Sequence, residues 1–327
     1  MAERLEAAMT PEAWTLDVPF ALARVDDGRT GVVRNDEIRL LSDDELGAKS
    51  LNAFLAAPDW GRLEAVAESA DAWRPVDSVR LAAPVEPRQV LQTGANYREH
   101  VIELVAAGLT QDGDRSPEEA RAFAADLMDR RKAEGEPYFF IGLPACVVGV
   151  DEALTLPSYS EQHDWELELA VVIGRETYRI SAAEAEAHIA GYTIVNDITT
   201  RDLVFRKDMK EIGTDWYRSK NAPGFLPTGP YLVPAPFVDP GDLGIRLSLN
   251  GTVMQDSRTS DLLFDIPTLV AQASQTMPLR PGDLLLTGSP AGNGMHWGRM
   301  LQDDDVMVGS IERLGSQTVR CTTEEDT

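Results

Sequence analysis

The sequence contains little cysteine and no long apolar run. Cys146 and Cys321 are the only cysteines among 327 residues. Two cysteines so far apart exclude a disulfide framework and a thiolate zinc site. No stretch reaches the roughly 20 apolar residues that a membrane-spanning helix needs, and the first residues lack the basic and apolar regions of a signal peptide. These absences predict a cytoplasmic protein without sulfur chemistry.

Positive charge is also scarce in this chain. It has 30 Lys and Arg residues against 54 Asp and Glu residues, which gives a formal net charge of −24. Nucleic acid and anionic membrane surfaces are bound largely through Lys and Arg, so both are excluded as partners. The same charge repels a small anionic substrate. A site for such a substrate therefore has to be locally positive, through a metal ion, a lysine or backbone N–H groups.

The apolar fraction of 43% is that of an ordinary globular protein. Short β-branched runs broken by turn residues predict small antiparallel hairpins over residues 20–41. Two short helices are expected to follow, within residues 43–55 and 61–69. The N-terminal part therefore has the pattern of a small α/β unit.

A domain boundary is expected near Ala83. The segment LAAPVEPR around it carries two prolines and shows no periodicity. We therefore expect a small N-terminal accessory domain over residues 1–83 and a larger domain over residues 84–327. The second domain has mostly β signals, so the predicted class is a β-rich α+β protein without internal repeats.

Residues 96–108 (NYREHVIELVAAG) have the endpoints of a helix. Asn96 is expected as its N-cap, Glu99 at its third helical position and Gly108 as its stop. A second, charged helix is predicted from Ser116 to about residue 135, after a link at residues 110–115. The remaining predicted elements are strands at 90–93, 145–150, 167–173, 192–195, 245–249, 252–255 and 284–286, and helices at 181–191 and 265–274.

Three acidic residues suggest a metal site. Glu166 and Glu168 are two apart on a predicted strand, so their carboxylates point to the same face. At about 4 Å they would repel by roughly 4 kcal/mol at an effective dielectric near 20, unless one is protonated or a cation lies between them. Asp197 ends another apolar strand and offers a third oxygen. Carboxylates without nearby His or Cys suit Mg²⁺, Mn²⁺ or Ca²⁺. The alternative is a solvated acidic strand face, which arises readily by chance in so acidic a chain.

The chain resembles the fumarylacetoacetate hydrolase family over about residues 90–311. The resemblance is carried by an ordered set of motifs, which read here as GANYREHVIE, PYFFIGLPACVVG, DWELELAVVIG, GYTIVNDITTRD, WYRSKNAPGFLPTGPYL, LNGTVMQDS and LRPGDLLLTGSPAG. A single one of these motifs could match by accident, but their common order is specific.

The resemblance implies a mixed β-roll and β-sandwich core, commonly in a homodimer. It also implies that Glu166, Glu168 and Asp197 bind the catalytic metal, usually Mg²⁺, with Mn²⁺ or Ca²⁺ as alternatives. Members of the family cleave carbon–carbon bonds in small diketo acids such as acylpyruvates and fumarylpyruvate, while relatives decarboxylate or isomerise related 2-oxo acids. A metal-binding or scaffold protein without turnover is the remaining possibility.

His100 and Glu103 match a pair that activates water in many family members. They lie three apart on the predicted helix, so contact between them is possible, and a Glu that orients an imidazole raises its basicity. Lys220 matches the family lysine that faces the substrate's carboxylate or developing enolate. Without the resemblance, all three would be read as solvated surface residues.

Three further residues are candidate substrate contacts. The hydroxyl of Thr287 and the backbone N–H of Gly288 could hold the substrate carboxylate, or form a plain turn. Arg201 matches the family's Arg and either meets the substrate or braces the end of a strand. We assign no role to His163, His188 and His296.

The chain also departs from the family pattern. Gly142 stands where relatives commonly carry Lys, Pro223 where an Asp is frequent, and Leu203–Val204 where a Gln is frequent. The stretch after the His–Glu helix is longer than usual, which predicts an enlarged lid over residues 104–136. These departures leave the substrate open, whereas the three expected metal ligands are all present.

Overall fold

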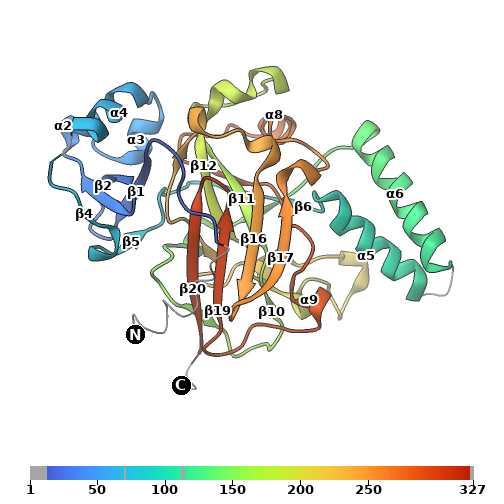
Figure 1. Ribbon diagram of the computed structural model, residues 1–327. Helices are drawn as coiled ribbons and strands as arrows, with labels where there is room; N and C mark the ends of the chain where they lie inside the picture. The colour runs from blue at the N-terminus through green and yellow to red at the C-terminus, as the bar shows by residue number, and fades with distance from the viewer. Residues whose placement is uncertain (1–12, 70, 112–114, 325–327) are drawn as a thin grey trace.

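The computed structural model describes residues 13–69, 71–111 and 115–324 (Figure 1). A small N-terminal sheet lies beside a larger body built from further sheets, and two long helices stand on the opposite side of that body. The predicted β-rich α+β class is confirmed. In the described part of the chain, no helix is both long enough and apolar enough to cross a bilayer.

The N-terminal sheet has the strand order β4-β3-β2-β1-β5. Its central strands form two antiparallel hairpins, as the sequence predicts. Ser42 begins the first helix with a reciprocal capping box to Glu45. The bounds are β1 Ala21–Val25, β2 Thr30–Arg34, β3 Glu37–Leu40, α2 Asp43–Leu46, α3 Leu51–Leu55, α4 Trp60–Ser69, β4 Arg74–Pro75 and β5 Leu81–Ala82.

The central sheet of the body has the strand order β15-β12-β11-β18-β6-β7. Its members are β6 Val90–Gly94, β7 Tyr138–Gly142, β11 Leu167–Ile173, β12 Ile189–Asn196, β15 Val233–Pro234 and β18 Leu284–Leu286. Strand β11 is buried along its whole length. Its alternate side chains enter two different cores, with Leu169 and Val171 in one and Ala170 and Val172 in the other. Packing on both faces explains why this strand reads as a continuous apolar run.

A second large sheet packs against the central one. Its strand order is β17-β16-β19-β20-β9, and Ile245 and Leu247 of β16 share a core with Leu169 of β11. The hairpin between β16 and β17 turns at Asn250 and Gly251, both with positive φ, as the Asn-Gly pair predicts. The bounds are β9 Leu154–Leu156, β16 Gly244–Leu249, β17 Thr252–Arg258, β19 Val306–Ile311 and β20 Gly315–Thr323. Two further sheets have two short strands each. They are β8 Val147–Val148 with β14 Leu226–Pro227, and β10 His163–Asp164 with β13 Thr199–Thr200.

The two long helices are α5 (Arg98–Gln111) and α6 (Pro117–Glu134), drawn in teal and green in Figure 1. Ser116 caps α6 through a capping box with Glu119, as predicted. The predicted ends of α5 are wrong. The helix begins at Arg98, where Asp261 accepts from the backbone N–H of Glu99, and it runs past Gly108. The middle of the predicted link, residues 112–114, lies outside the described residues.

Asn96 is a structural residue and not an N-cap. It is buried, and its amide donates to the carbonyls of Phe264 and Thr287, while its side-chain oxygen accepts from the N–H of Phe264. These three bonds hold the start of α5 against distant parts of the chain. Sequence alone could not supply those partners, because Phe264 and Thr287 are more than 160 residues away.

The other helices are short. They are α7 Trp216–Lys220, α8 Ile266–Thr276 and α9 Gly294–Trp297. Asp265 caps α8 as predicted. The expected helix over 181–191 is a 3₁₀ helix that ends at His188, because β12 begins at the next residue. The strand expected over 145–150 is reduced to β8 for a similar reason, since a 3₁₀ turn occupies Pro144–Cys146.

Candidate metal and catalytic site

The candidate residues converge at one edge of the central sheet. Strand β11 runs antiparallel to both β12 and β18, so its beginning lies beside their ends. Strand β6 is parallel to β18 and ends at the same edge. Glu166 and Glu168 lie at the beginning of β11, and Asp197 follows β12 directly. Topology thus brings together strand ends from distant parts of the sequence.

Glu166, Glu168 and Asp197 form a compact group of carboxylates. Each offers one oxygen, and these oxygens lie within 4.8 Å of one another. The side chains of Glu168 and Asp197 are buried, and that of Glu166 is 15% exposed. Three carboxylates in so little solvent repel strongly unless cations balance them. The arrangement predicted from the two-residue spacing is therefore present.

Lys220 supplies one of the balancing charges. It lies at the end of α7 and is 2% exposed. Its ammonium donates to Glu166 Oε2 at 2.7 Å and also to Asp197 Oδ2. The ring of Phe140 covers it, with 5.5 Å from Nζ to the ring centroid. The structure thus brings Lys220 to the predicted metal ligands, where it bonds to two of the three.

Arg201 supplies the second cation. Its guanidinium lies 2.7 Å from Glu166 Oε1 and 2.6 Å from Asp164 Oδ2. Asp164 in turn accepts from the backbone N–H groups of Gly294 and Met295 at the start of α9. The sequence left two roles open for Arg201, contact with the substrate or support for the end of a strand. These ion pairs correspond to the supporting role. The sequence analysis did not single out Asp164, although it precedes Glu166 and Glu168 with the same two-residue spacing.

The burial and charges perturb the ionisation of the group. Burial would raise the pKa of Glu166, but the charges of Lys220 and Arg201 bring it down to about 2. Burial raises the pKa of Asp197 to about 6, although Lys220 opposes the shift. Burial, together with the charges of Asp197 and Glu166, holds the pKa of Glu168 well above its usual range. Of the three carboxyls, Glu168 is therefore the one that most favours a proton or an added cation.

Thr287 and Gly288 follow β18 at the same edge. The backbone N–H of Gly288 donates to Glu168 Oε2 at 2.7 Å, and the Thr287 hydroxyl donates to the carbonyl of Leu169 at 2.9 Å. Thr287 is fully buried. Both candidate substrate contacts are thus engaged with β11, and the Gly288 bond orients one of the three carboxylates.

His100 and Glu103 lie on α5, which follows β6. Among the described residues no hydrogen bond joins them. Instead, Glu103 Oε2 lies 3.7 Å from Nδ1 of His296 on α9. Burial lowers the pKa of His100, and the nearby charge of Glu166 opposes that shift. Burial thus favours the neutral form of the His100 imidazole. The sequence assigned no role to His296, because its proximity to Glu103 depends on the fold.

The other two histidines are structural. Both ring nitrogens of His163 are bonded, to Thr200 Oγ1 at 3.0 Å and to the carbonyl of Pro157 at 2.9 Å. His188 lies 3.0 Å from the Thr177 hydroxyl. Neither belongs to the group of three carboxylates.

A divalent cation fits the chemistry of this group. The three ligand oxygens are hard donors, which Mg²⁺, Mn²⁺ and Ca²⁺ prefer, and their convergence in a buried place favours a cation. Gly288 and Arg201 hold Glu168 and Glu166 from outside the group. Such outer bonds orient ligands in metal sites generally.

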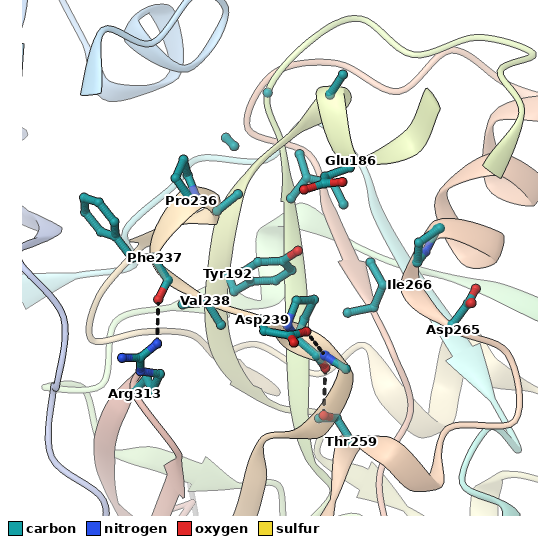
Figure 2. Close-up of a pocket in the computed structure, with 18 of the residues that line it drawn as sticks. Glu186, Tyr192, Pro236, Phe237, Val238, Asp239, Thr259, Asp265, Ile266 and Arg313 are labelled. Atoms are coloured by element: carbon teal, nitrogen blue, oxygen red, sulfur yellow. Dashed lines mark hydrogen bonds between the residues drawn. The ribbon is translucent and has the colours of Figure 1, made fainter. Parts of the chain in front are cut away.

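A separate pocket lies away from the carboxylates. It has a volume of about 1150 Å³ and is shown in Figure 2. Among the residues around it are Tyr192, Phe237, Thr259 and Arg313. None of the three carboxylates lines it. The titratable cluster, and not this pocket, is therefore the candidate site for the chemistry.

Comparison with known proteins identifies relatives over most of the chain. The family described as "Fumarylacetoacetate (FAA) hydrolase C-terminal" matches residues 89–322. A fumarylacetoacetate hydrolase domain-containing protein 2 homolog from Dictyostelium discoideum is 30% identical over 301 residues, which cover 87% of this chain and 89% of the relative. All the residues of the site lie within the matched range.

Solved structures have the same fold. The maleylpyruvate hydrolase from Sphingobium sp. SYK-6, in complex with manganese(II) and pyruvate, is 25% identical with a TM-score of 0.71, over 93% of this chain and all of that one. The 2-hydroxyhepta-2,4-diene-1,7-dioate isomerase from Mycobacterium marinum is 27% identical with a TM-score of 0.68, over 95% of this chain and all of that one. The similar proteins thus include both a hydrolase and an isomerase.

Proposed function

The chain belongs to the fumarylacetoacetate hydrolase family, and we propose that it is a metal-dependent hydrolase that cleaves a carbon–carbon bond in a small diketo acid. The substrate would be of the acylpyruvate or fumarylpyruvate type. The observation that carries the proposal is the buried group of three carboxylates with Lys220 against two of them. A merely structural cluster of this kind would be costly to bury, whereas a site for a cation and an anionic substrate needs it.

We propose Glu166, Glu168 and Asp197 as the metal ligands, with Mg²⁺ as the resident ion and Mn²⁺ or Ca²⁺ as substitutes. The manganese(II) ion in the Sphingobium relative supports a divalent cation in this site. When bound, a divalent cation would chelate the 2-oxo acid end of the substrate and lower the free-energy cost of an enolate. The overall charge of −24 makes such a local positive centre necessary for an anionic substrate.

His100 is proposed as the general base. Its lowered pKa keeps the imidazole neutral, so that it can take a proton from water as the water oxygen attacks the distal carbonyl. The carbon–carbon bond then breaks, and its electron pair stays on the pyruvate-like fragment as an enolate. The proton taken by His100 returns to the enolate carbon. Glu103 is the proposed partner of the imidazolium, and it lies on the same helix, where His296 also approaches it.

Lys220 is proposed to stabilise the developing enolate. Its ammonium is fixed by Glu166 and covered by Phe140, so little reorganisation is needed when negative charge appears beside it. Arg201, Thr287 and Gly288 stay proposed substrate contacts. Their bonds to Glu166, Leu169 and Glu168, respectively, support an additional role, in which they hold β11 and its carboxylates in place.

Three broader features complete the proposal. Residues 104–136 are proposed as a lid over the bound substrate, because α5 and α6 stand beside the body and α5 carries His100 (Figure 1). The boundary between the accessory and catalytic domains is proposed near Ala83, where the N-terminal sheet ends. A cytoplasmic homodimer stays the predicted state of the protein.

The alternative is an isomerase or decarboxylase that uses the same site. The isomerase from Mycobacterium marinum supports it. With a substrate that has no distal carbonyl, enolate stabilisation by the same residues would give proton transfer or loss of carbon dioxide instead of hydrolysis. A non-catalytic metal-binding protein is a weaker alternative, because Glu166, Glu168, Asp197, His100, Glu103 and Lys220 are all present.

The proposal is tested by assaying purified protein on acylpyruvates, fumarylpyruvate and oxaloacetate, with EDTA, with Mg²⁺ and with Mn²⁺. Hydrolysis that needs the metal and is lost in Glu168→Gln would support it. Full activity in EDTA or in that variant would contradict it. If His100→Ala loses hydrolysis and keeps decarboxylation, the two reactions use different proton-transfer groups. Inactivity on every substrate would favour the non-catalytic alternative.

A further inference from the structure

Gln92 contacts Asp197 from a strand that contributes none of the proposed metal ligands. It lies in the middle of β6 and is fully buried. Its side-chain Nε2 donates to Asp197 Oδ1 at 2.5 Å. The other oxygen of Asp197, Oδ2, is the one that Lys220 contacts. The two oxygens of this carboxylate thus have different partners, a neutral amide on one side and a cation on the other.

Gly142 on the neighbouring strand β7 provides the space that Gln92 occupies. In the register of β6 and β7, Val90 is opposite Gly142 and Gln92 is opposite Phe140, so all four positions lie on one face of the sheet. A Cβ atom at Gly142 would lie 3.0 Å from Gln92 Oε1. Gly142 is not among the glycines with positive φ. Space, and not backbone conformation, therefore explains the glycine.

The amide also has an unused acceptor. Gln92 Oε1 is buried and has no hydrogen-bond partner among the described residues. An unpaired buried acceptor costs about 1–3 kcal/mol. The structure therefore has the hydrogen bond from Nε2 to Asp197 even though this orientation leaves Oε1 unpaired. Turning the amide over would pair oxygen with oxygen and would break that bond unless Asp197 were protonated. The orientation therefore suits an ionised Asp197.

A neutral donor has a property that a lysine or arginine lacks. It fixes the direction of a carboxylate without cancelling its charge, so the carboxylate keeps its attraction for a metal ion. In metal sites, loss of such an outer partner typically weakens metal binding about 10- to 100-fold. Lys220, by contrast, contacts the other oxygen of Asp197 and also Glu166, and it adds a positive charge there.

We propose that Gln92 is a positioning residue, which fixes Asp197 as a metal ligand, and that residue 142 is glycine because Gln92 needs its space. The inference rests on the proposed metal centre. It extends the site to β6 and β7 and gives the departure at Gly142 a physical cause.

The test is the affinity of the full chain for Mn²⁺, measured by isothermal titration calorimetry and by the Mn²⁺-dependent rise in melting temperature. Gln92→Met keeps the shape and removes the donor, and we expect its affinity to fall about 10- to 100-fold. Gln92→Asn, whose amide is one methylene too short, should also bind more weakly and serves if the first variant does not fold. Thr93→Val is the matched control, because Thr93 is the adjacent buried residue and donates only to the carbonyl of Leu286.

The possible outcomes separate the two proposals. Weaker Mn²⁺ binding in the Gln92 variants, with normal binding in Thr93→Val, would support the role of Gln92. Equal binding in wild type and both Gln92 variants would overturn it, since a merely structural role changes melting temperature but not metal affinity. If wild type itself binds no Mn²⁺, the proposed metal function fails instead.

A double-mutant cycle tests the part played by Gly142. Gly142→Ala should weaken Mn²⁺ binding in the wild-type background, because the new methyl group displaces the amide. In the Gln92→Ala background the same substitution should leave metal affinity unchanged, since no amide remains to be displaced. An equal loss in both backgrounds would show that Gly142 acts independently of Gln92 and would overturn that part of the proposal.

Discussion

The ammonium of Lys220 lies 2.7 Å from Glu166 Oε2, inside the group of carboxylates that is proposed to bind a metal. Asp197 raises the pKa of Lys220 and Glu166 adds to this, so that together they outweigh the opposing effect of burial. The lysine is therefore charged and takes part in balancing the acidic group. Removing that charge should have consequences that depend on whether a metal ion is present.

Lys220→Met should destabilise the metal-free protein by about 3–5 kcal/mol, because it removes one of the two cations that balance the buried carboxylates and leaves Asp197 with the neutral amide of Gln92. Added Mn²⁺ should restore more stability to this variant than to wild type, since the ion then supplies the missing charge. Urea denaturation in EDTA and in Mn²⁺ measures both effects. Lys207→Met, at an exposed lysine in the segment that precedes α7, is the control. Equal stability of both variants in EDTA would contradict the prediction.

The lowered pKa of His100 predicts the acid limb of the pH–rate profile. The base has to be neutral, and its pKa lies below the ordinary value of 6.5. The kcat/KM value should therefore fall only when the pH drops below about 6.5, and it should be level above that pH until another group titrates. A pH profile in a constant-ionic-strength buffer measures this. An acid limb well above 6.5 would show that His100 is not the controlling base.

The raised pKa of Glu168 predicts that metal binding releases protons. Burial and the charges of Asp197 and Glu166 hold the pKa of Glu168 well above its usual range and so favour its protonated form, whereas a metal ligand has to be ionised. Affinity for Mg²⁺ or Mn²⁺ should thus increase as the pH rises through this pKa and level off above it. Calorimetry in two buffers of different ionisation enthalpy counts the protons. Flat affinity with no proton release would contradict the assignment.

Asp164→Asn should be strongly destabilising. The substitution leaves Arg201 with one ionic partner fewer in a buried place and weakens the anchoring of α9, so we expect a loss of about 3–5 kcal/mol in the free energy of unfolding. Asp256→Asn removes an ion pair to Arg246 in which Asp256 is 53% exposed, and it should cost less than about 1 kcal/mol. Similar losses in the two variants would show that Asp164 has no special structural role.

Local patterns in the sequence predicted much of this fold. The capping residues Ser116 and Asp265 marked helix starts because a cap depends on residues within one turn. The spacing of Glu166 and Glu168 placed two carboxylates on one face for a similarly local reason. The prediction of Asn96 as an N-cap was wrong because its hydrogen-bond partners belong to distant elements. Its side chain stabilises the tertiary structure and does not cap the adjacent helix.

The contacts that organise the site could not be predicted from the sequence, for the same physical reason. Gln92 meets Asp197 across 105 residues of sequence, and His296 meets Glu103 through a four-residue helix that is anchored by Asp164. Such pairs depend on strand order, which no local pattern encodes. The lysine was expected to face the substrate, and its bonds to Glu166 and Asp197 could be seen only once β11, β12 and α7 had been brought together.

The most direct test of the proposed hydrolysis is the fate of the oxygen of water. The best acylpyruvate substrate would be turned over in ¹⁸O-labelled water with Mg²⁺, and the acid fragment would be examined by mass spectrometry. Hydrolysis of the carbon–carbon bond predicts one ¹⁸O atom in the new carboxylate of that fragment, and no such product in His100→Ala. Turnover that gives an isomer or carbon dioxide, with no labelled acid, would contradict it.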